Sequence, residues 1–380
     1  MIDLDRKLVE MRPYNDIEVQ EAMIRLLKHK EFEQILKYVF PNQDIDISLE
    51  QMRNVKSTND FQRIFSSSAV EEILNKTASC FSFSGLENLR NDSSYLFISN
   101  HRDIVMDSAI LQNVLLTNGH RTTQITFGSN LMSNQFIIDI GKINKMFTFY
   151  RGGSRNDIYY NALAHSLYIK KVLTEEDQSI WIAQRDGRTK NGNDKTQLSL
   201  LKMLTIKQKD PIKAIKQFNI VPVSISYELE PCDILKVNES IISEKGSYAK
   251  KKDEDFNSVL TGITGKKGKI HLAFGEPINS FIDANADTLT ACNIHENVCK
   301  EMDRQIYLNY KLNPINYVCY DIISYIDSGL NVTYNETDIK ETRALIDRKA
   351  NELSAINKNM AKQKLYEMYA APVRNYLNQK

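Results

Sequence analysis

The sequence has few features of secreted, membrane-spanning or nucleic-acid-binding proteins. Only 5 of its 380 residues are cysteines and none forms a Cys-x-x-Cys pair, so we expect reduced thiols in a cytosolic compartment. The 49 basic and 48 acidic residues nearly cancel, which argues against nucleic acid as a partner and leaves only local basic sites. No apolar run approaches the length of about 18 residues that a membrane span needs. Residues 1–7 lack the apolar segment of a signal peptide, so any membrane contact is expected to be peripheral.

The spacing of apolar residues divides the chain into three regions. Residues 1–80 and 281–380 carry mostly helical spacing, including an expected helix over 17–40 that ends before Pro41. Residues 81–280 alternate short apolar runs with amphipathic segments, which predicts an α/β domain with a mixed, mostly parallel sheet flanked by helices and extended by helical regions at both ends. Strands are expected at 95–98, 124–127, 147–150, 179–183, 220–227 and 269–274, and helices at 104–116, 157–173, 197–208 and 211–217.

A histidine follows the first of these expected strands. The run Tyr95-Leu-Phe-Ile predicts a buried strand, Ser99-Asn100 turns the chain, and His101 precedes a helix that carries Asp107. An imidazole with a carboxylate behind it has the chemistry of a general base and its orienting partner. Taken alone, a single histidine is more often structural, so the choice between the two interpretations depends on the rest of the chain.

Two basic, glycine-containing loops follow other expected strands. Their candidate ligand-binding residues are Arg151, Gly152 and Gly153 in the first loop and Asp186, Gly187, Arg188 and Lys190 in the second. Glycine permits a close approach of the backbone, and guanidinium groups bind phosphate through two parallel hydrogen bonds. Either loop alone is more simply an ordinary turn with solvated side chains. Two such loops after neighbouring strands indicate one site for an anionic ligand.

Other catalytic classes lack their motifs. The tripeptide His101-Arg102-Asp103 occurs in protein kinases, but Ser108 stands where kinases carry a metal-binding Asn, and no Asp-Phe-Gly follows. No Gly-x-Ser-x-Gly occurs, so the sequence does not indicate a serine nucleophile. The 6 histidines are scattered along the chain, so we expect no metal site, and nothing in the sequence calls for a cofactor.

In their order along the chain, these segments resemble the motifs of the glycerolipid acyltransferase family, which includes glycerol-3-phosphate and 1-acylglycerol-3-phosphate acyltransferases. That family shows a His and an Asp separated by four residues, a Phe/Arg/Gly block, a Glu-Gly-x-Arg block and an apolar strand with Val-Pro. The similar segments here are 100–107, 149–153, 186–190 and 221–223, followed by Phe-Gly-Glu-Pro-Ile at 274–278, which is similar to the end of the family's catalytic domain. The resemblance covers residues 80–280.

Two positions depart from the family's pattern. Five residues rather than four separate His101 from Asp107, so the helix is expected to start later or to carry a bulge. Asp103 is a rival partner, although it lies only two residues from the histidine. Asp186 replaces the usual Glu, with one residue fewer before Arg188. The second departure bears on the acceptor more than on the reaction.

The resemblance implies a direct transfer of a fatty acyl group. His101, oriented by Asp107, would remove the proton of an acceptor hydroxyl, which attacks the thioester of acyl-CoA or an acyl-carrier protein. Arg151 and Arg188, helped by Lys190, would hold the phosphate of a glycerol-phosphate or lysophosphatidate acceptor in phospholipid biosynthesis. Two alternatives stay open: an acceptor that is another hydroxylated lipid, such as an amino-acid lipid, and a catalytically silent lipid-binding module on the same fold.

The resemblance also implies a location in the cytoplasm, peripheral on the inner face of the membrane. Candidate side chains for contact with lipid occur in the C-terminal region. They are Tyr307, Tyr310, Lys311, Tyr366 and Tyr369. We expect these side chains either to cover an acyl tunnel or lie on a bilayer, or to pack against the α/β core, with packing the simpler interpretation.

Overall fold

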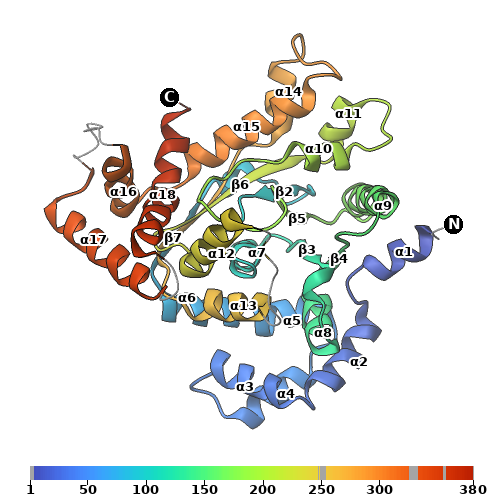
Figure 1. Ribbon diagram of the computed structural model, residues 1–380. Coiled ribbons are helices and arrows are strands. Elements are labelled where there is room, and N and C mark those ends of the chain that lie inside the picture. Colours follow the sequence, from blue (N-terminus) through green and yellow to red (C-terminus); the bar gives the residue numbers. More distant parts are fainter. Residues whose placement is uncertain (1–3, 247, 249–253, 325–332, 354–356, 380) are drawn as a thin grey trace.

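The computed structural model describes residues 4–246, 248, 254–324, 333–353 and 357–379 of the chain (Figure 1). A seven-stranded sheet at its centre has the strand order β1-β7-β6-β2-β5-β3-β4. All neighbouring strands pair in parallel except β6 and β7, which are antiparallel. The strands are β1 (Ala78–Ser84), β2 (Leu96–Ser99), β3 (Gln124–Gly128), β4 (Met146–Phe149), β5 (Ile180–Ala183), β6 (Ile220–Tyr227) and β7 (Gly268–Phe274). The predicted α/β class with a mixed, mostly parallel sheet is confirmed.

Helices surround the sheet and form both ends of the described chain (Figure 1). The N-terminal helices are α1 (Leu4–Met11), α2 (Asp16–Leu26), α3 (Lys30–Val39), α4 (Ile45–Arg53), α5 (Thr58–Phe61) and α6 (Ser67–Thr77), with a π-helical turn over Gln62–Ser66. Between the strands lie α7 (Met106–Thr117), α8 (Gln135–Ile143), α9 (Arg155–Thr174), α10 (Leu198–Leu204), α11 (Pro211–Gln217), α12 (Asp233–Lys245) and α13 (Glu254–Thr264). The C-terminal helices are α14 (Ile278–Ala284), α15 (Ile294–Asn309), α16 (Pro314–Ser324), α17 (Glu336–Asn351) and α18 (Lys358–Leu377).

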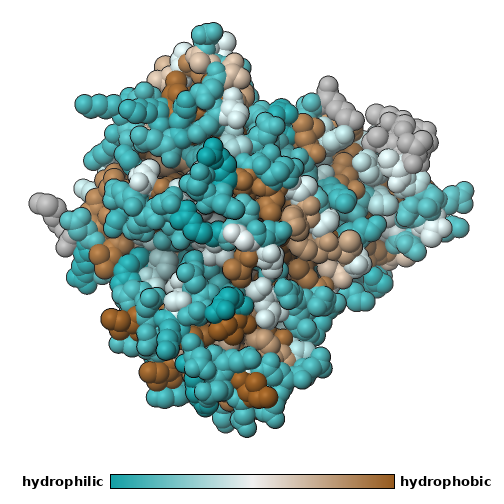
Figure 2. Space-filling view, turned by 180° about the vertical axis from the view of Figure 1, so that it is seen from behind, coloured by the Kyte–Doolittle hydropathy of each residue, from teal (hydrophilic) through white to brown (hydrophobic). Residues whose placement is uncertain are grey.

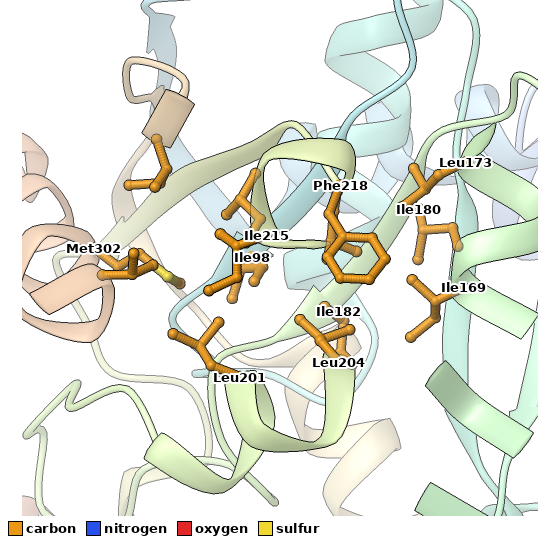
Figure 3. Close-up of a cluster of buried hydrophobic side chains, with 14 of the residues drawn as sticks. Ile98, Ile169, Leu173, Ile180, Ile182, Leu201, Leu204, Ile215, Phe218 and Met302 are labelled. Atoms are coloured by element: carbon orange, nitrogen blue, oxygen red, sulfur yellow. The ribbon is translucent and has the colours of Figure 1, made fainter. Parts of the chain in front are cut away.

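The sheet separates two hydrophobic clusters because successive side chains of a strand point to opposite faces. Leu96 and Ile98 of β2 belong to one cluster, in which they pack with residues of α9, α10 and α15. Figure 3 shows this cluster, with Ile98 and Ile182 lying among side chains of the surrounding helices. Tyr95 and Phe97 belong to the other cluster, with residues of α6 and α7. Burial on both faces explains why the central strands read as continuous apolar runs.

The N-terminal helical region differs from the sequence-based prediction. The single helix expected over 17–40 is wrong, because α2 ends at Leu26 and α3 begins at Lys30. Apolar spacing continues across this break, so periodicity alone does not detect it. The division of the chain into regions 1–80, 81–280 and 281–380 stays a prediction.

The tyrosines that were candidates for contact with lipid are mostly buried. Tyr307, Tyr310 and Tyr369 all lie in the interior, and the Tyr369 hydroxyl donates a hydrogen bond to Asp233 Oδ2 at 2.7 Å. A bilayer-facing role is therefore wrong for these three side chains, which instead pack against the body of the protein. Tyr366 is half-buried and Lys311 is exposed. Within the described ranges, no helix has the length and apolar character needed to cross a membrane.

Candidate active site

The candidate site lies where several parallel strands end. Strands β2, β5, β3 and β4 are neighbours with the same direction, so their carboxyl ends lie along one edge of the sheet. His101 follows β2, the 186–190 loop follows β5, and the Arg151 loop follows β4. The fold therefore brings the three sequence-predicted segments to the same edge, as expected for loops at the carboxyl ends of parallel strands.

The His101 imidazole contacts the Asp107 carboxylate. His101 Nδ1 lies 2.9 Å from Asp107 Oδ2. The same oxygen accepts hydrogen bonds from the backbone N–H groups of Arg102 at 2.6 Å and Asp103 at 2.9 Å. The other oxygen, Oδ1, accepts a hydrogen bond from the Tyr227 hydroxyl at 2.8 Å. Asp107 is thus held from several directions while it orients the histidine.

A late helix start accommodates the five residues between the two side chains. Helix α7 begins at Met106 rather than at 104, so Asp107 lies in its first turn. Asp103 sets this start, because its Oδ1 accepts hydrogen bonds from the N–H groups of Val105 and Met106, each at 2.9 Å. These are the bonds of a helix cap. Asp103 therefore supports the loop, and no hydrogen bond joins it to His101 in the described structure.

The hydrogen bond to Asp107 determines which nitrogen of the His101 imidazole is able to accept a proton. If Nδ1 donates its proton to the carboxylate, Nε2 carries a lone pair and is able to accept a proton. The His101 side chain is 13% exposed, so solvent or a ligand reaches it from one side. The Trp181 ring lies edge-on to the imidazole, with ring centroids 5.8 Å apart. Thr189 N donates a hydrogen bond to the His101 carbonyl at 2.9 Å, which ties the second basic loop to the histidine.

An ion pair joins the two basic loops. Arg151 Nη1 lies 3.0 Å from Asp186 Oδ1, and both residues are exposed. Gly152, Gly153 and Gly187 have φ values of +73°, +102° and +67°, in the left-handed region that side chains disfavour. The glycines therefore allow these turns to form, and the turns bring Arg151 and Asp186 together.

The remaining cations of the second loop have different surroundings. Arg188 is buried, and its Nη1 finds no hydrogen-bond partner within the described structure. A buried, unpaired guanidinium N–H is costly, which makes this atom a candidate donor to a ligand. Lys190 forms an ion pair with Glu239 of α12, so an acceptor phosphate would compete with that carboxylate for it.

A buried ionic network lies behind His101, and sequence reasoning missed it. Arg102 is only 1% exposed; its Nε donates to Asp194 Oδ2 at 3.1 Å, and its Nη1 donates to Glu230 Oε2 at 2.6 Å. Lys236 Nζ donates to Glu230 Oε1 at 2.5 Å and to the Arg102 carbonyl at 2.6 Å. Burial alone would lower the pKa of Arg102, but the charges of Asp194 and Glu230 raise it above its ordinary value. The network fixes the residue next to the histidine.

A second histidine supports the loop that carries Arg151. His165 Nε2 accepts a hydrogen bond from Tyr150 N at 2.9 Å, and its ring stacks on Phe149 with centroids 3.8 Å apart. Burial and the nearby charge of Lys7 lower the pKa of His165 to about 3. The neutral imidazole, which accepts from Tyr150 N, is therefore the form that the folded chain contains.

We expect acidification to destabilise the protein through His165. Between pH 6.5 and pH 3 the unfolded chain binds a proton at this residue while the folded chain does not. The free energy of unfolding should therefore fall, by up to about 1.4 kcal/mol per pH unit in this window. Urea unfolding at several pH values would measure this slope. His165→Gln keeps an acceptor for Tyr150 N and should show a shallower slope; an unchanged slope would contradict the assignment.

Comparisons with known proteins find a similar solved structure and a matching family model. No curated protein matches the chain. The solved structure of the 1-acyl-sn-glycerophosphate (LPA) acyltransferase PlsC from Thermotoga maritima is similar to this chain, with 14% sequence identity and a TM-score of 0.38, over 77% of this chain and 94% of that one. Residues 80–226 match a family model described as Acyltransferase. The matched segment runs from β1 to β6 and contains His101, Arg151 and Arg188.

Proposed function

We propose, from the premise that residues 80–226 belong to the acyltransferase family, that the protein transfers a fatty acyl group to the hydroxyl of a phosphorylated glycerolipid. The observation that carries this proposal is the His101–Asp107 contact of 2.9 Å at the same sheet edge as the two basic loops. The acceptor would be a lysophosphatidate or glycerol phosphate, and the donor acyl-CoA or an acyl-carrier protein. A cytoplasmic protein bound peripherally to the inner face of the membrane fits such substrates.

His101 acts as a general base in this reaction. Its Nε2 takes the proton of the acceptor hydroxyl while the hydroxyl oxygen attacks the thioester carbonyl carbon. Asp107 stabilises the imidazolium that forms, since Oδ2 accepts the Nδ1–H hydrogen bond. When the tetrahedral intermediate collapses, the carbon–sulfur bond breaks and the thiolate takes the proton from the imidazolium. The products are an ester and a free thiol, and the histidine returns to its neutral form.

Arg151 and Arg188 would bind the acceptor phosphate. Arg188 Nη1 has no partner from the described chain, and Arg151 reaches across to Asp186. A phosphate that accepts hydrogen bonds from both guanidinium groups would replace Asp186 as the partner of Arg151. Such charge-assisted contacts hold the acceptor hydroxyl near Nε2, and this positioning contributes to the rate.

Removal of the Arg151 side chain should weaken acceptor binding. Loss of one charge-assisted contact of about 1.5 to 3 kcal/mol corresponds to an increase in KM of about 10- to 150-fold. We expect Arg151→Ala to show this increase with lysophosphatidate, while kcat falls by a smaller factor because Arg188 would still position the phosphate. Arg90→Ala is a matched control, because Arg90 also forms an exposed ion pair, with Asp92. Equal KM values for Arg151→Ala and Arg90→Ala would contradict the phosphate-binding role.

The Arg151–Asp186 pair also favours a second acceptor class. It presents a cation and an anion side by side at the surface, which complements an acceptor with both an ammonium and an anionic group, such as an amino-acid lipid. A screen of lysophosphatidate, glycerol 3-phosphate and ornithine- or glycine-type lysolipids separates the classes. Asp186→Asn should impair turnover of an amino-acid lipid, whereas it should improve binding of a phosphate, because it frees Arg151.

The same screen tests whether the protein is an enzyme at all. Background-level turnover by both wild type and His101→Ala, with every acceptor and with both donor types, would contradict the proposal. That result would instead support a catalytically silent lipid-binding module on the same fold.

A further inference from the structure

The first turns of α9 extend beyond the body of the protein. Every residue from 151 to 160 is exposed, and the buried residues of α9 begin only at Asn161. Ile158, Tyr159 and Tyr160 expose 55%, 41% and 42% of their surfaces. The two tyrosine rings contact each other edge to face, with centroids 5.7 Å apart. Three consecutive large side chains thus face solvent on a protruding helix, directly after the loop that carries Arg151.

Basic side chains accompany this apolar group. Lys207 Nζ lies 5.7 Å from the centroid of the Tyr159 ring, within the range of a cation–π contact. Arg155, in the first turn of α9, is also exposed. The nearby carboxylate of Asp157 is engaged in the helix cap, where it accepts hydrogen bonds from Ser154 N and Ser154 Oγ. The exposed charges of this group are therefore two cations, Arg155 and Lys207, and one carboxylate, Asp157, so its net charge is +1.

We propose that the α9 tip, defined as Arg155, Ile158, Tyr159, Tyr160 and Lys207, docks onto an anionic lipid bilayer. Tyrosine combines an apolar ring with a polar hydroxyl and prefers the membrane–water interface. Lysine and arginine beside it are attracted to anionic headgroups. An acidic protein would account for the charges but leaves the exposed Ile158 and the two rings unexplained. The bilayer accounts for both.

The place of the α9 tip links docking to the proposed reaction. Arg151 lies four residues before Arg155, and Gly152 and Gly153 connect them. The Asp157 side chain lies against Gly153, whereas no atom lies within 4 Å of the position that a Cβ would take at Gly152. A bilayer in contact with the α9 tip would bring lipid headgroups to the loop where Arg151 would receive the acceptor phosphate. This step rests on the proposed function; the docking itself does not.

Two exposed apolar residues away from the α9 tip provide a control. Figure 2 shows a rear face that is largely hydrophilic, with apolar residues in separate small groups. Phe83 on β1 and Leu308 on α15 are exposed. Strand β1 is one edge of the sheet and β4, which precedes α9, is the other. Phe83→Ser combined with Leu308→Ser is therefore a matched control for the loss of exposed apolar surface away from the α9 tip.

Flotation with lipid vesicles tests the proposal. The full-length protein should bind equimolar phosphatidylglycerol–phosphatidylcholine vesicles, and bind pure phosphatidylcholine vesicles more weakly. The variant with Ile158, Tyr159 and Tyr160 all changed to serine should bind the anionic vesicles at least about tenfold more weakly, because binding scales with the apolar area inserted. Arg155→Glu with Lys207→Glu should abolish the preference for the anionic vesicles. Circular dichroism confirms that each variant folds.

The outcomes separate docking from catalysis. Turnover of soluble glycerol 3-phosphate should be unchanged in the triple serine variant, while turnover of vesicle-embedded lysophosphatidate should fall. Without any turnover the proposed function fails, yet flotation still tests docking. Vesicle binding equal to that of wild type, or equal losses in the Phe83/Leu308 control, would overturn the proposal. So would an affinity for an acidic carrier protein that the triple serine variant loses while vesicle binding stays intact.

Discussion

His101→Ala is expected to slow acyl transfer by about 10²- to 10⁴-fold, the usual contribution of a positioned general base. Without the imidazole, the acceptor hydroxyl would have to lose its proton to water while it attacks the thioester. The loss should appear in kcat, because the proposed role of His101 is proton transfer, whereas Arg151 and Arg188 would bind the acceptor phosphate. Release of free thiol from the donor, measured continuously with a thiol reagent, follows the reaction directly.

Asp107→Asn should also slow the reaction, by less than the loss of the histidine. The amide keeps the size of the side chain, but it no longer stabilises an imidazolium, and its NH₂ group would face Nδ1–H or the N–H groups of Arg102 and Asp103. His29→Ala is the control, because His29 is an exposed residue at the start of α3. Full activity in His101→Ala, or an equal loss in His29→Ala, would remove His101 from the mechanism.

The sequence predicts the central strands well because they are buried on both faces. Strand β6 and helix α11 were predicted with the bounds that they have, 220–227 and 211–217. In β6 every residue is buried, so the apolar run and the strand coincide. In α11 the cap Asp210 and Pro211 mark the first turn. In both elements, the residues of the element and its cap are enough to predict its type and its bounds.

Strand β1 is absent from the prediction because its local signal is short and its partner lies far away in the sequence. Its residues, Ala-Ser-Cys-Phe-Ser-Phe-Ser, are half-buried or exposed, and it lies at the edge of the sheet. It pairs with β7, which comes about half the chain later, in the register Phe81 with Ile270. Its partner is known only once the sheet has formed, whereas the alternation of Phe81, Ser82, Phe83 and Ser84 is a local strand signal that the prediction did not use.

In the candidate site, too, some features are predicted from neighbouring residues, whereas others depend on residues far away in the sequence. The dyad partners His101 and Asp107 were chosen from sequence, but their contact depends on the cap that Asp103 makes to α7. No spacing rule distinguishes a capping aspartate from a dyad partner. The partners of Arg102, Asp194 and Glu230, lie 92 and 128 residues away in the sequence. From the sequence alone, Arg102 is interpreted as an exposed cation in a loop. Sequence motifs do not predict a network whose members lie so far apart in the chain.

The Arg102 network has the largest predicted effect on stability. Arg102→Met removes one cation from a buried group that contains two carboxylates and Lys236. Asp194 then loses its ionic partner, and Glu230 keeps only Lys236. Removal of one member of a buried ion pair costs about 3 to 5 kcal/mol, because the remaining charge is neither solvated nor matched. Guanidinium chloride unfolding at neutral pH should show a loss of this size.

Two further variants test whether the charge or the shape of the buried Arg102 side chain stabilises the protein. Arg121→Met is the control, because Arg121 and Asp177 form a surface pair whose side chains are 52% and 62% exposed, and its loss should cost less than about 1 kcal/mol. Arg102→Lys keeps the charge but not the fork that reaches Asp194, Glu230 and the Gly192 carbonyl together, so its stability should lie between wild type and Arg102→Met. Equal losses in Arg102→Met and Arg121→Met would mean that water reaches the network. In that case the loop behind His101 would be held by the Asp103 cap and the Asp107 hydrogen bonds alone.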